Sequence, residues 1–228
     1  SCNMLFGCTG YYSYEHPYQP TFKGENDFSG KIVHPQNWTI EDDKFIVDKK
    51  IAIIGSGATA VTLLPNIANV AEHVTMIQRT PSYIGANPTV DKISKWCIDN
   101  LPMRLALFLN RWRVILIGFL FFHFCVKFPG RAKKLIKGAT KKQLKGVMSE
   151  EEVDKHFTPP YNPWAQRFCL APGGDFFASI RKGKASVVTD HIECFTEKGI
   201  KMKSGKVIEA DLIVRATGLT FQPNFPFS

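Results

Sequence analysis

The sequence contains no CxxC pair, although it has six cysteines in 228 residues. A zinc cluster and a dithiol redox centre both need closely spaced ligands, so neither a metal site nor a redox pair is expected. Disulfide scaffolds are typical of much shorter secreted chains, and the default expectation is a reducing, cytoplasmic compartment. No internal repeat is present. The hydrophobic fraction of 44% excludes a disordered or fibrous chain.

Acidic residues are missing from one long segment. Between Arg104 and Lys145 the chain has eleven basic residues and no Asp or Glu. The remainder has 18 basic residues against 20 acidic ones, so the net charge of +9 is a property of this segment. It does not indicate that the whole protein binds nucleic acid, and no nucleic-acid partner is expected. The eleven residues are Arg104, Arg111, Arg113, Lys127, Arg131, Lys133, Lys134, Lys137, Lys141, Lys142 and Lys145.

The clearest periodic signal lies between residues 50 and 80. Residues 51–54 are an uninterrupted apolar run, which predicts a strand buried on both faces. A Gly-Ser-Gly break, a helix over residues 58–71 and a second strand over residues 74–77 are predicted to follow. This βαβ order predicts an α/β fold with a Rossmann-like domain, a helical insertion and a β-rich C-terminal part.

Elsewhere the pattern is less regular. Residues 1–49 indicate loop and turn, and the proline-rich residues 156–174 indicate a loop. Residues 89–157 are helical in character, and Ser149 with Glu152 forms a capping box at the start of a short helix. Strands are predicted over residues 186–189, 192–196, 199–202 and 211–214, with a turn at 203–206.

A glycine-rich loop joins the first strand to its helix. Residues 55–60 have the form GxGxxA. The first glycine makes the tight turn, the second lets the backbone approach a pyrophosphate, and the small sixth residue lets helix and strand pack closely. A plain structural turn is the alternative, since glycine turns between strand and helix are common. The candidate cofactor-binding residues are Gly55, Ser56, Gly57, Ala58, Thr59 and Ala60.

The end of the second strand discriminates between NADP and NAD. An NAD site needs Asp or Glu about 20 residues after the loop, to accept hydrogen bonds from the ribose hydroxyls. This chain has Arg79 and Thr80 there. A guanidinium pairs with a 2′-phosphate through two hydrogen bonds, so the sequence favours NADP(H). The alternative is that Arg79 is a solvated charge at the end of a strand.

Four residues upstream of the loop form a spaced motif. Phe28, Gly30, His34 and Trp38 spell FxGxxxHxxxW. This resembles the fingerprint of the Baeyer–Villiger monooxygenases and their relatives, the flavin-containing monooxygenases. It is the most specific signal in the chain. By this resemblance His34 and Trp38 are linker residues that couple domains rather than residues that touch substrate.

Further motifs agree in order with this family. Residues 9–11 (TGY) look like the linker leaving an FAD domain, and residues 211–218, ending in Thr217 and Gly218, look like the linker that returns to it. The family's FAD-binding βαβ unit is not found, so the chain is expected to be an internal piece of a longer flavoprotein. The resemblance divides the chain into a linker region at 1–49, an NADP-binding domain at 50–85 and 157–215, a helical insertion at 86–156, and a returning linker at 216–228.

The resemblance assigns the catalytic arginine to Arg167, which follows a proline-rich loop. A fixed guanidinium there holds an anionic flavin peroxide and polarises a substrate carbonyl. The alternative is a structural arginine that stacks on Trp164 or pairs with Asp175.

Three positions depart from the Baeyer–Villiger pattern. Gln166 stands where a lysine often helps to bind the 2′-phosphate, so this contact falls to Arg79 and Thr80. Thr39 follows the fingerprint in place of Pro or Asp, and residues 219–220 (LT) replace an aromatic residue and an acid. The tryptophan of the fingerprint itself favours the Baeyer–Villiger branch. The subfamily therefore stays open.

The implied activity is that of an FAD- and NADPH-dependent monooxygenase. With O₂ it inserts one oxygen atom into a ketone or oxygenates a soft nitrogen or sulfur, so the partners are a small-molecule ketone, amine or sulfide and O₂. One alternative is a flavin disulfide reductase-like oxidoreductase, which needs a cysteine pair. Another is a non-catalytic NADPH-binding fragment. The isolated chain is expected neither to hold FAD nor to turn over.

An apolar run lies inside the basic segment. Residues 114–126 are thirteen uncharged residues, fewer than the 20 or so that span a bilayer. A buried helix of the insertion is the first interpretation. The alternative is an interfacial helix whose basic neighbours meet anionic lipid, which gives peripheral membrane contact through residues 104–145.

Overall fold

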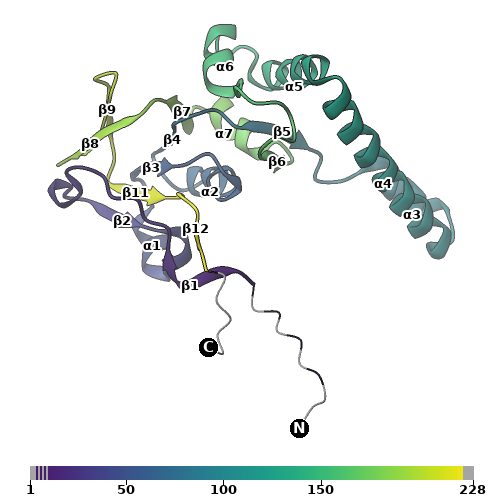
Figure 1. The fold of residues 1–228 in the computed structure, drawn as a ribbon, viewed down its shortest axis with the longest axis horizontal. Coiled ribbons are helices and arrows are strands. Elements are labelled where there is room, and N and C mark those ends of the chain that lie inside the picture. The colour runs from purple at the N-terminus through teal and green to yellow at the C-terminus, as the bar shows by residue number, and fades with distance from the viewer. Residues whose placement is uncertain (1–3, 5, 7, 9, 223–228) are drawn as a thin grey trace.

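The computed structural model describes residues 4, 6, 8 and 10–222. Thr9 of the first expected linker and the part of the second after residue 222 lie outside the described residues. The predicted βαβ unit is confirmed as β3 (Lys50–Ile54), α2 (Ala58–Ala68) and β4 (His73–Gln78) (Figure 1).

A five-stranded parallel sheet forms the centre of the molecule. Its order is β2-β11-β3-β4-β7, and it adds β2 (Lys31–Val33), β11 (Leu212–Arg215) and β7 (Ala185–Thr189) to the βαβ unit. Every neighbouring pair is parallel. This confirms the α/β fold class.

Alternate residues of the central strands enter two separate cores. Ile51 and Ile53 of β3 pack on the side of α2 and of α7 (Asp175–Arg181). Ala52 and Ile54 pack on the other side, against the antiparallel sheet formed by β8 (Ile192–Thr196), β9 (Gly199–Met202) and β10 (Val207–Glu209). Burial on both faces explains why the strand has no polar alternation.

The C-terminal strands agree closely with the sequence prediction. β8 (Ile192–Thr196) and β9 (Gly199–Met202) have the expected bounds, and β10 (Val207–Glu209) follows the expected turn. The loop expected over residues 156–174 is wrong in part, because it contains β6 (Phe168–Pro172). β6 pairs in parallel with β5 (Tyr83–Asn87), which lies about 80 residues earlier in the chain. Because the two strands are so far apart in sequence, no local pattern predicts that they pair.

The N-terminal 49 residues hold more structure than the loop and turn expected. β1 (Tyr12–Pro17) pairs with β12 (Leu219–Phe221), and β2 forms the edge of the central sheet. Helix α1 (Ile40–Phe45) begins at a capping box between Thr39 and Asp42, and two short 3₁₀ turns complete the region. These elements have three to six residues, too few for a readable period.

The helical insertion contains α3 (Lys92–Asn100), α4 (Met103–Lys127), α5 (Pro129–Leu144) and α6 (Glu150–Phe157). The capping box of Ser149 and Glu152 is confirmed at the start of α6.

The expectation that the apolar run forms a buried helix is wrong. The apolar run lies in α4, which extends away from the sheets in Figure 1 and buries only two of its 25 residues, Ala106 and Cys125. By length and composition α4 is also long enough to cross a membrane, with a mean hydropathy of 1.7 and 6% burial in its apolar window. The uncharged run of thirteen residues, 114–126, is therefore only part of the apolar helix, which has 25 residues.

Candidate functional site

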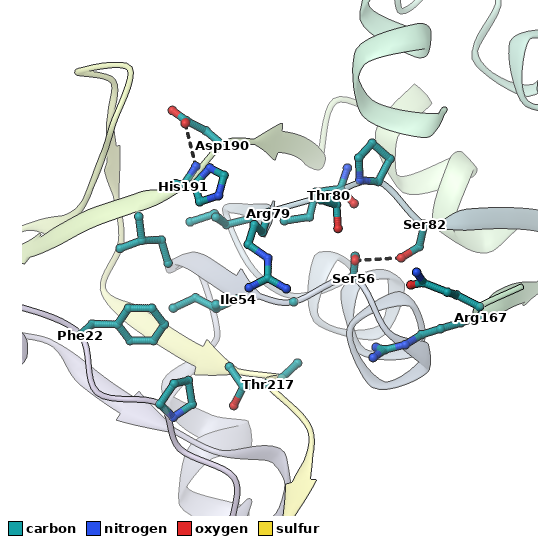
Figure 2. A pocket seen from close by; sticks show the side chains of 18 of the residues that line it. Phe22, Ile54, Ser56, Arg79, Thr80, Ser82, Arg167, Asp190, His191 and Thr217 are labelled. Atoms are coloured by element: carbon teal, nitrogen blue, oxygen red, sulfur yellow. Dashed lines mark hydrogen bonds between the residues drawn. The ribbon is translucent and has the colours of Figure 1, made fainter. Parts of the chain in front are cut away.

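A cavity of about 550 Å³ opens at the carboxyl ends of β3, β4 and β11. This edge of a parallel sheet is where ligands bind in open α/β folds, because loops and helix N-termini converge there. Ile54, labelled in Figure 2, ends β3. Gln78 ends β4, and Ala216 follows β11. The cavity therefore lies where the glycine-rich loop was expected to bind a nucleotide.

Gly55 is held in a conformation that favours glycine. Its φ is +128°, and a Cβ atom there would lie 2.3 Å from the carbonyl oxygen of Ala216. Its own amide donates to the carbonyl of Ile77 at 2.8 Å, which ties the loop to the neighbouring strand. The loop is thus fixed by β4 and by the residue after β11, and no side chain fits at this position.

The loop leaves the start of α2 open to an anion. Gly57 is the N-cap residue, and no side chain caps the helix. Ala58 and Thr59 are exposed in the first turn, whereas Ala60 is fully buried against the sheet. Uncapped amide groups at a helix N-terminus bind phosphate groups well, so these residues fit the diphosphate of a dinucleotide.

Ser56 has a polar partner across the cavity. Its hydroxyl lies 2.9 Å from the hydroxyl of Ser82, which follows β4 (Figure 2). This contact joins the glycine-rich loop to the segment that also carries Arg79 and Thr80. The two parts of the expected NADP site are therefore brought together.

Arg79 and Thr80 lie at the end of β4 and line the cavity, as expected for residues that recognise the ribose end of a dinucleotide. In Figure 2 the Arg79 side chain points into the cavity above the end of β3. It is exposed and makes no ion pair with the residues that the structure describes. No described residue therefore neutralises its charge through an ion pair.

Sequence reasoning missed three further residues of this cavity: Asp190, His191 and Lys203. Lys203 stands in the turn between β9 and β10, and its amide donates to the carbonyl of His191 at 2.8 Å. The turn itself was predicted, but no local pattern shows that it folds back to the end of β4.

The Asp190 carboxylate is the acidic group in this wall. It accepts hydrogen bonds from the backbone amides of Ser204 and His191, at 3.1 and 2.7 Å. Hydrogen bonding, chiefly from Ser204, lowers the pKa of Asp190 below its ordinary value, so the carboxylate is ionised. The same cavity is lined by Arg79, Arg167 and Lys203, and the positive charges therefore outnumber this one negative charge.

Arg167 lies against the glycine-rich loop. A Cβ atom on Gly57 would meet the guanidinium Nη1 at 2.6 Å, which places this group beside the start of α2. Trp164 stacks on Phe168 instead, with ring centroids 6.0 Å apart. Within the described part of the chain, Arg167 makes neither a cation–π contact with Trp164 nor an ion pair with Asp175. The two structural alternatives for this arginine are therefore not formed.

Phe28 and Gly30 of the FxGxxxHxxxW motif form part of the packing beside β11. Phe28 is buried and contacts Phe195 edge-on, with ring centroids 6.5 Å apart. A Cβ atom on Gly30 would lie 2.3 Å from the carbonyl oxygen of Asp211 and 2.5 Å from the Phe28 ring. The close approach lets the amide of Lys31 donate to the same carbonyl and begin β2.

His34 links the motif to the turn after β11. Its Nδ1 accepts from the amide of Gln36 at 3.1 Å, so the proton is on Nε2, which donates to the carbonyl of Gly218 at 3.1 Å. Burial lowers the pKa of His34, which keeps the ring neutral. The hydroxyl of Thr217 donates to the carbonyl of Tyr18 at 2.7 Å. Two hydrogen bonds therefore tie the turn at 217–218 to the N-terminal region.

Trp38 is half-buried against the larger core, and its indole N–H donates to Asp43 at 2.8 Å. Trp38, His34, Phe28 and Gly30 do not line the cavity, whereas Thr217 does. The predicted residues that line the cavity are Gly55, Ser56, Arg79, Thr80, Arg167 and Thr217. Gly57, Ala58, Thr59 and Ala60 lie just beyond it at the start of α2.

Curated relatives match nearly the whole chain. The FAD-containing monooxygenase EthA of Mycolicibacterium smegmatis is 47% identical over 223 residues, which are 97% of this chain and 44% of that protein. The probable FAD-binding monooxygenase AlmA of Acinetobacter baylyi is 46% identical over 222 residues, 96% of this chain and 43% of that protein. The chain therefore spans a little under half the length of these relatives.

Solved structures share the fold at low sequence identity. OTEMO in complex with FAD and NADP superimposes with a TM-score of 0.67 at 19% identity, over 92% of this chain and 46% of that chain. Cyclohexanone monooxygenase bound to ε-caprolactone gives a TM-score of 0.66 at 18% identity, over 93% of this chain and 47% of that one. At this identity the likeness supports the fold alone.

The family described as flavin-binding monooxygenase-like matches residues 2–228, and the match includes both the glycine-rich loop and the FxGxxxHxxxW motif. The resemblance inferred from these motifs is therefore confirmed, and the chain belongs to the flavin-binding monooxygenase-like family.

Proposed function

We propose that this chain is the NADP-binding part of an NADPH-dependent flavin monooxygenase. The observation that carries the proposal is the cavity at the sheet edge, which is lined by Gly55 and Ser56 of the glycine-rich loop and by three cationic side chains. The uncapped start of α2 follows this loop directly. Such a site suits a ligand with a diphosphate and a further phosphate. The relatives named as FAD-containing monooxygenases support the same assignment.

NADP(H) is favoured over NAD(H) by the charges at the end of β4. Arg79 and Lys203 come from separate elements and line one cavity, and Gln166 lines it at the place where the family resemblance implies a lysine. We propose that Lys203 supplies the cation that Gln166 lacks, and that Arg79, Thr80 and Lys203 bind the 2′-phosphate together. The solved relative OTEMO, described as a complex with FAD and NADP, supports this choice.

FAD is the second proposed cofactor. When bound, the flavin accepts hydride from NADPH and activates O₂. The described residues place Arg167 beside the glycine-rich loop, where its guanidinium can stabilise negative charge and polarise a carbonyl oxygen. No second glycine-rich βαβ unit occurs among the described residues, so the FAD site is proposed to lie mainly in the remainder of the longer protein.

The proposed substrate is a small ketone, with an amine or sulfide as the second class. Cyclohexanone monooxygenase among the structural neighbours favours the ketone.

The same proposal places the NADP-binding domain at residues 50–85 and 157–215, with the edge strand β2 added, and the insertion at residues 86–156. The enzyme is proposed to work in the cytoplasm, and contact with a membrane is argued separately below from α4.

The full-length protein tests the function directly. Purified with FAD, it is expected to consume NADPH in preference to NADH and to place one atom of ¹⁸O₂ in the product of a cyclic ketone or a sulfide. A lactone product assigns the Baeyer–Villiger reaction, and a sulfoxide product with no lactone assigns the second class. NADPH oxidation without labelled product from either substrate contradicts the proposal and favours a reductase.

The cofactor choice has its own test. Arg79→Ala and Lys203→Ala each remove one charge-assisted hydrogen-bonding group worth about 1.5–3 kcal/mol, so the Kd for NADPH is expected to rise about 10- to 150-fold in each variant. The Kd for NADH is expected to stay within about threefold, because NADH lacks the 2′-phosphate.

Lys201→Ala is the matched control, because Lys201 lies on β9 and pairs with Glu193 away from the cavity. This variant is expected to change neither the Kd for NADPH nor the Kd for NADH. Equal losses of NADPH and NADH affinity in the Arg79 variant contradict the assigned role.

A further inference from the structure

Helix α4 contacts the rest of the protein along one narrow stripe. The residues that are buried or half-buried form two groups on this stripe: Ala106, Asn110 and Arg113, and then Phe121, Phe124 and Cys125. Between them, all seven residues of 114–120 are exposed, on every side of the helix. A Cβ atom added to Gly118 would meet nothing within 4 Å. About two turns of helix thus have no partner among the residues that the structure describes.

The exposed surface of α4 is apolar on all sides. A helix that lies on a globular core in water carries polar residues on its outer face. In α4 fourteen large hydrophobic side chains are at least 40% exposed, and an apolar surface of this extent marks an interaction site. They are Met103, Leu105, Leu107, Phe108, Leu109, Trp112, Val114, Ile115, Leu116, Ile117, Phe119, Leu120, Phe122 and Val126.

The charge around this surface is of one sign. The segment 104–145 has eleven basic residues and no acidic residue. Three are paired with acidic groups of neighbouring elements: Arg113 with Asp91, Lys137 with Asp154, and Lys141 with Glu150. The other eight make no ion pair with a described residue. They surround the apolar helix at both ends and along α5, and they complement an anionic surface.

The pair formed by α3 and α4 leaves the body of the protein and returns to it on the same side (Figure 1). Two residues join α3 to α4, and Phe128 alone separates α4 from α5. The hydroxyl of Ser94 in α3 donates to Asn110 in α4, so the short α3 lies alongside the long helix. The elements that flank this pair, β5 and α5, contact each other in the body of the protein. The fold therefore suits a helix lying in the membrane interface, not one that crosses.

We propose that α4 is an interfacial membrane helix that inserts into one leaflet of an anionic phospholipid bilayer, with the eight unpaired basic residues on the lipid headgroups. Anionic headgroups attract nearby Lys and Arg, while the apolar side chains enter the boundary of the acyl chains. Trp96 of α3 and Trp112 of α4 are both more than half exposed, and tryptophan is favoured at this interface. This proposal does not depend on the catalytic activity.

Vesicle flotation of the full-length protein tests the proposal. Binding is expected to vesicles of phosphatidylglycerol and phosphatidylcholine at low salt, with little binding to phosphatidylcholine alone and a clear loss at 1 M salt, because salt screens the headgroup attraction. Binding should shift the fluorescence of Trp96 and Trp112 to shorter wavelength.

Paired variants identify the surface. Leu116→Gln with Leu120→Gln lies in the fully exposed stretch and is expected to weaken vesicle binding at least about tenfold without loss of helical circular dichroism. Val70→Gln with Val207→Gln is the control, since both residues are exposed apolar side chains far from α4 in sequence. The control is expected to bind vesicles as the unaltered protein does.

Three results would overturn the proposal. The first is the absence of binding to anionic vesicles. The second is strong protection of α4 from hydrogen exchange in the vesicle-free full-length protein, which would show that the rest of the chain covers the helix. The third is a concentration-dependent dimer that the Leu116→Gln, Leu120→Gln variant abolishes, which would show that a second copy is the partner.

Discussion

The buried ion pair between Glu25 and Arg215 gives a prediction that can be worked out from distances. Arg215 ends β11 with its side chain 7% exposed, and its guanidinium lies 2.6 Å from the carboxylate of Glu25, which is 21% exposed. The same guanidinium lies over the ring of Phe22, 5.9 Å from its centroid. The Glu25 carboxylate also accepts from the amide of Phe22 at 2.5 Å. Glu25→Gln removes the negative charge and leaves the guanidinium buried.

The expected cost is large for a single substitution. Removing one partner of a buried pair destabilises a protein by about 3–5 kcal/mol, and the partial exposure of Glu25 favours the lower end. At about 2–4 °C per kcal/mol for a chain of this size, a loss of about 3 kcal/mol lowers Tm by about 6–12 °C. Thermal unfolding followed by circular dichroism measures this.

A surface pair supplies the control. Lys201 and Glu193 lie 3.1 Å apart with side chains more than 40% exposed, so Glu193→Gln is expected to cost less than about 1 kcal/mol. The double variant Glu25→Gln, Arg215→Met removes the unpaired charge and should recover part of the lost Tm. If Glu25→Gln and Glu193→Gln lower Tm equally, burial is not what makes the Glu25–Arg215 pair important.

Two further outcomes are expected. Arg167→Gln in the full-length enzyme should reduce oxygenation of a ketone about 100-fold or more while NADPH still binds, because a charge-stabilising donor beside the Gly57 loop is lost; unchanged turnover would contradict this role. Burial lowers the pKa of His34 below its ordinary value of 6.5, so the unfolded chain takes up a proton below that pH before the folded chain does. Stability should be level above about pH 6.5 and fall as the pH drops towards the lowered value, and urea unfolding of His34→Gln should show a weaker fall.

The sequence predicted local features of this fold well. The apolar run of β3, the glycine-rich loop and the strands β8 and β9 each depend on neighbouring residues, and each was recognised. The pair β5 and β6 was missed because its partners are about 80 residues apart in the chain. Lys203 was missed for the same reason, since only the folded chain brings its turn to the end of β4.

Helix α4 was misjudged for a different reason. Apolar runs in sequence indicate removal from water, but they do not say what removes them. A buried core helix and a helix that meets another surface have the same composition. Only the contacts distinguish them, and those of α4 are confined to one stripe.

The antiparallel pair of β1 and β12 has a consequence for how such a unit can be carried within a longer chain. Tyr12 faces Phe221 across this pair, so the entry and exit of the whole unit are neighbouring residues about 5 Å apart. If a longer chain is interrupted at this point, the two sides of the interruption are only a narrow gap apart. Folding of the inserted residues then compensates the entropy cost of bringing those two sides together. About 200 residues can therefore leave a longer chain and return to it through one pair of neighbouring strands.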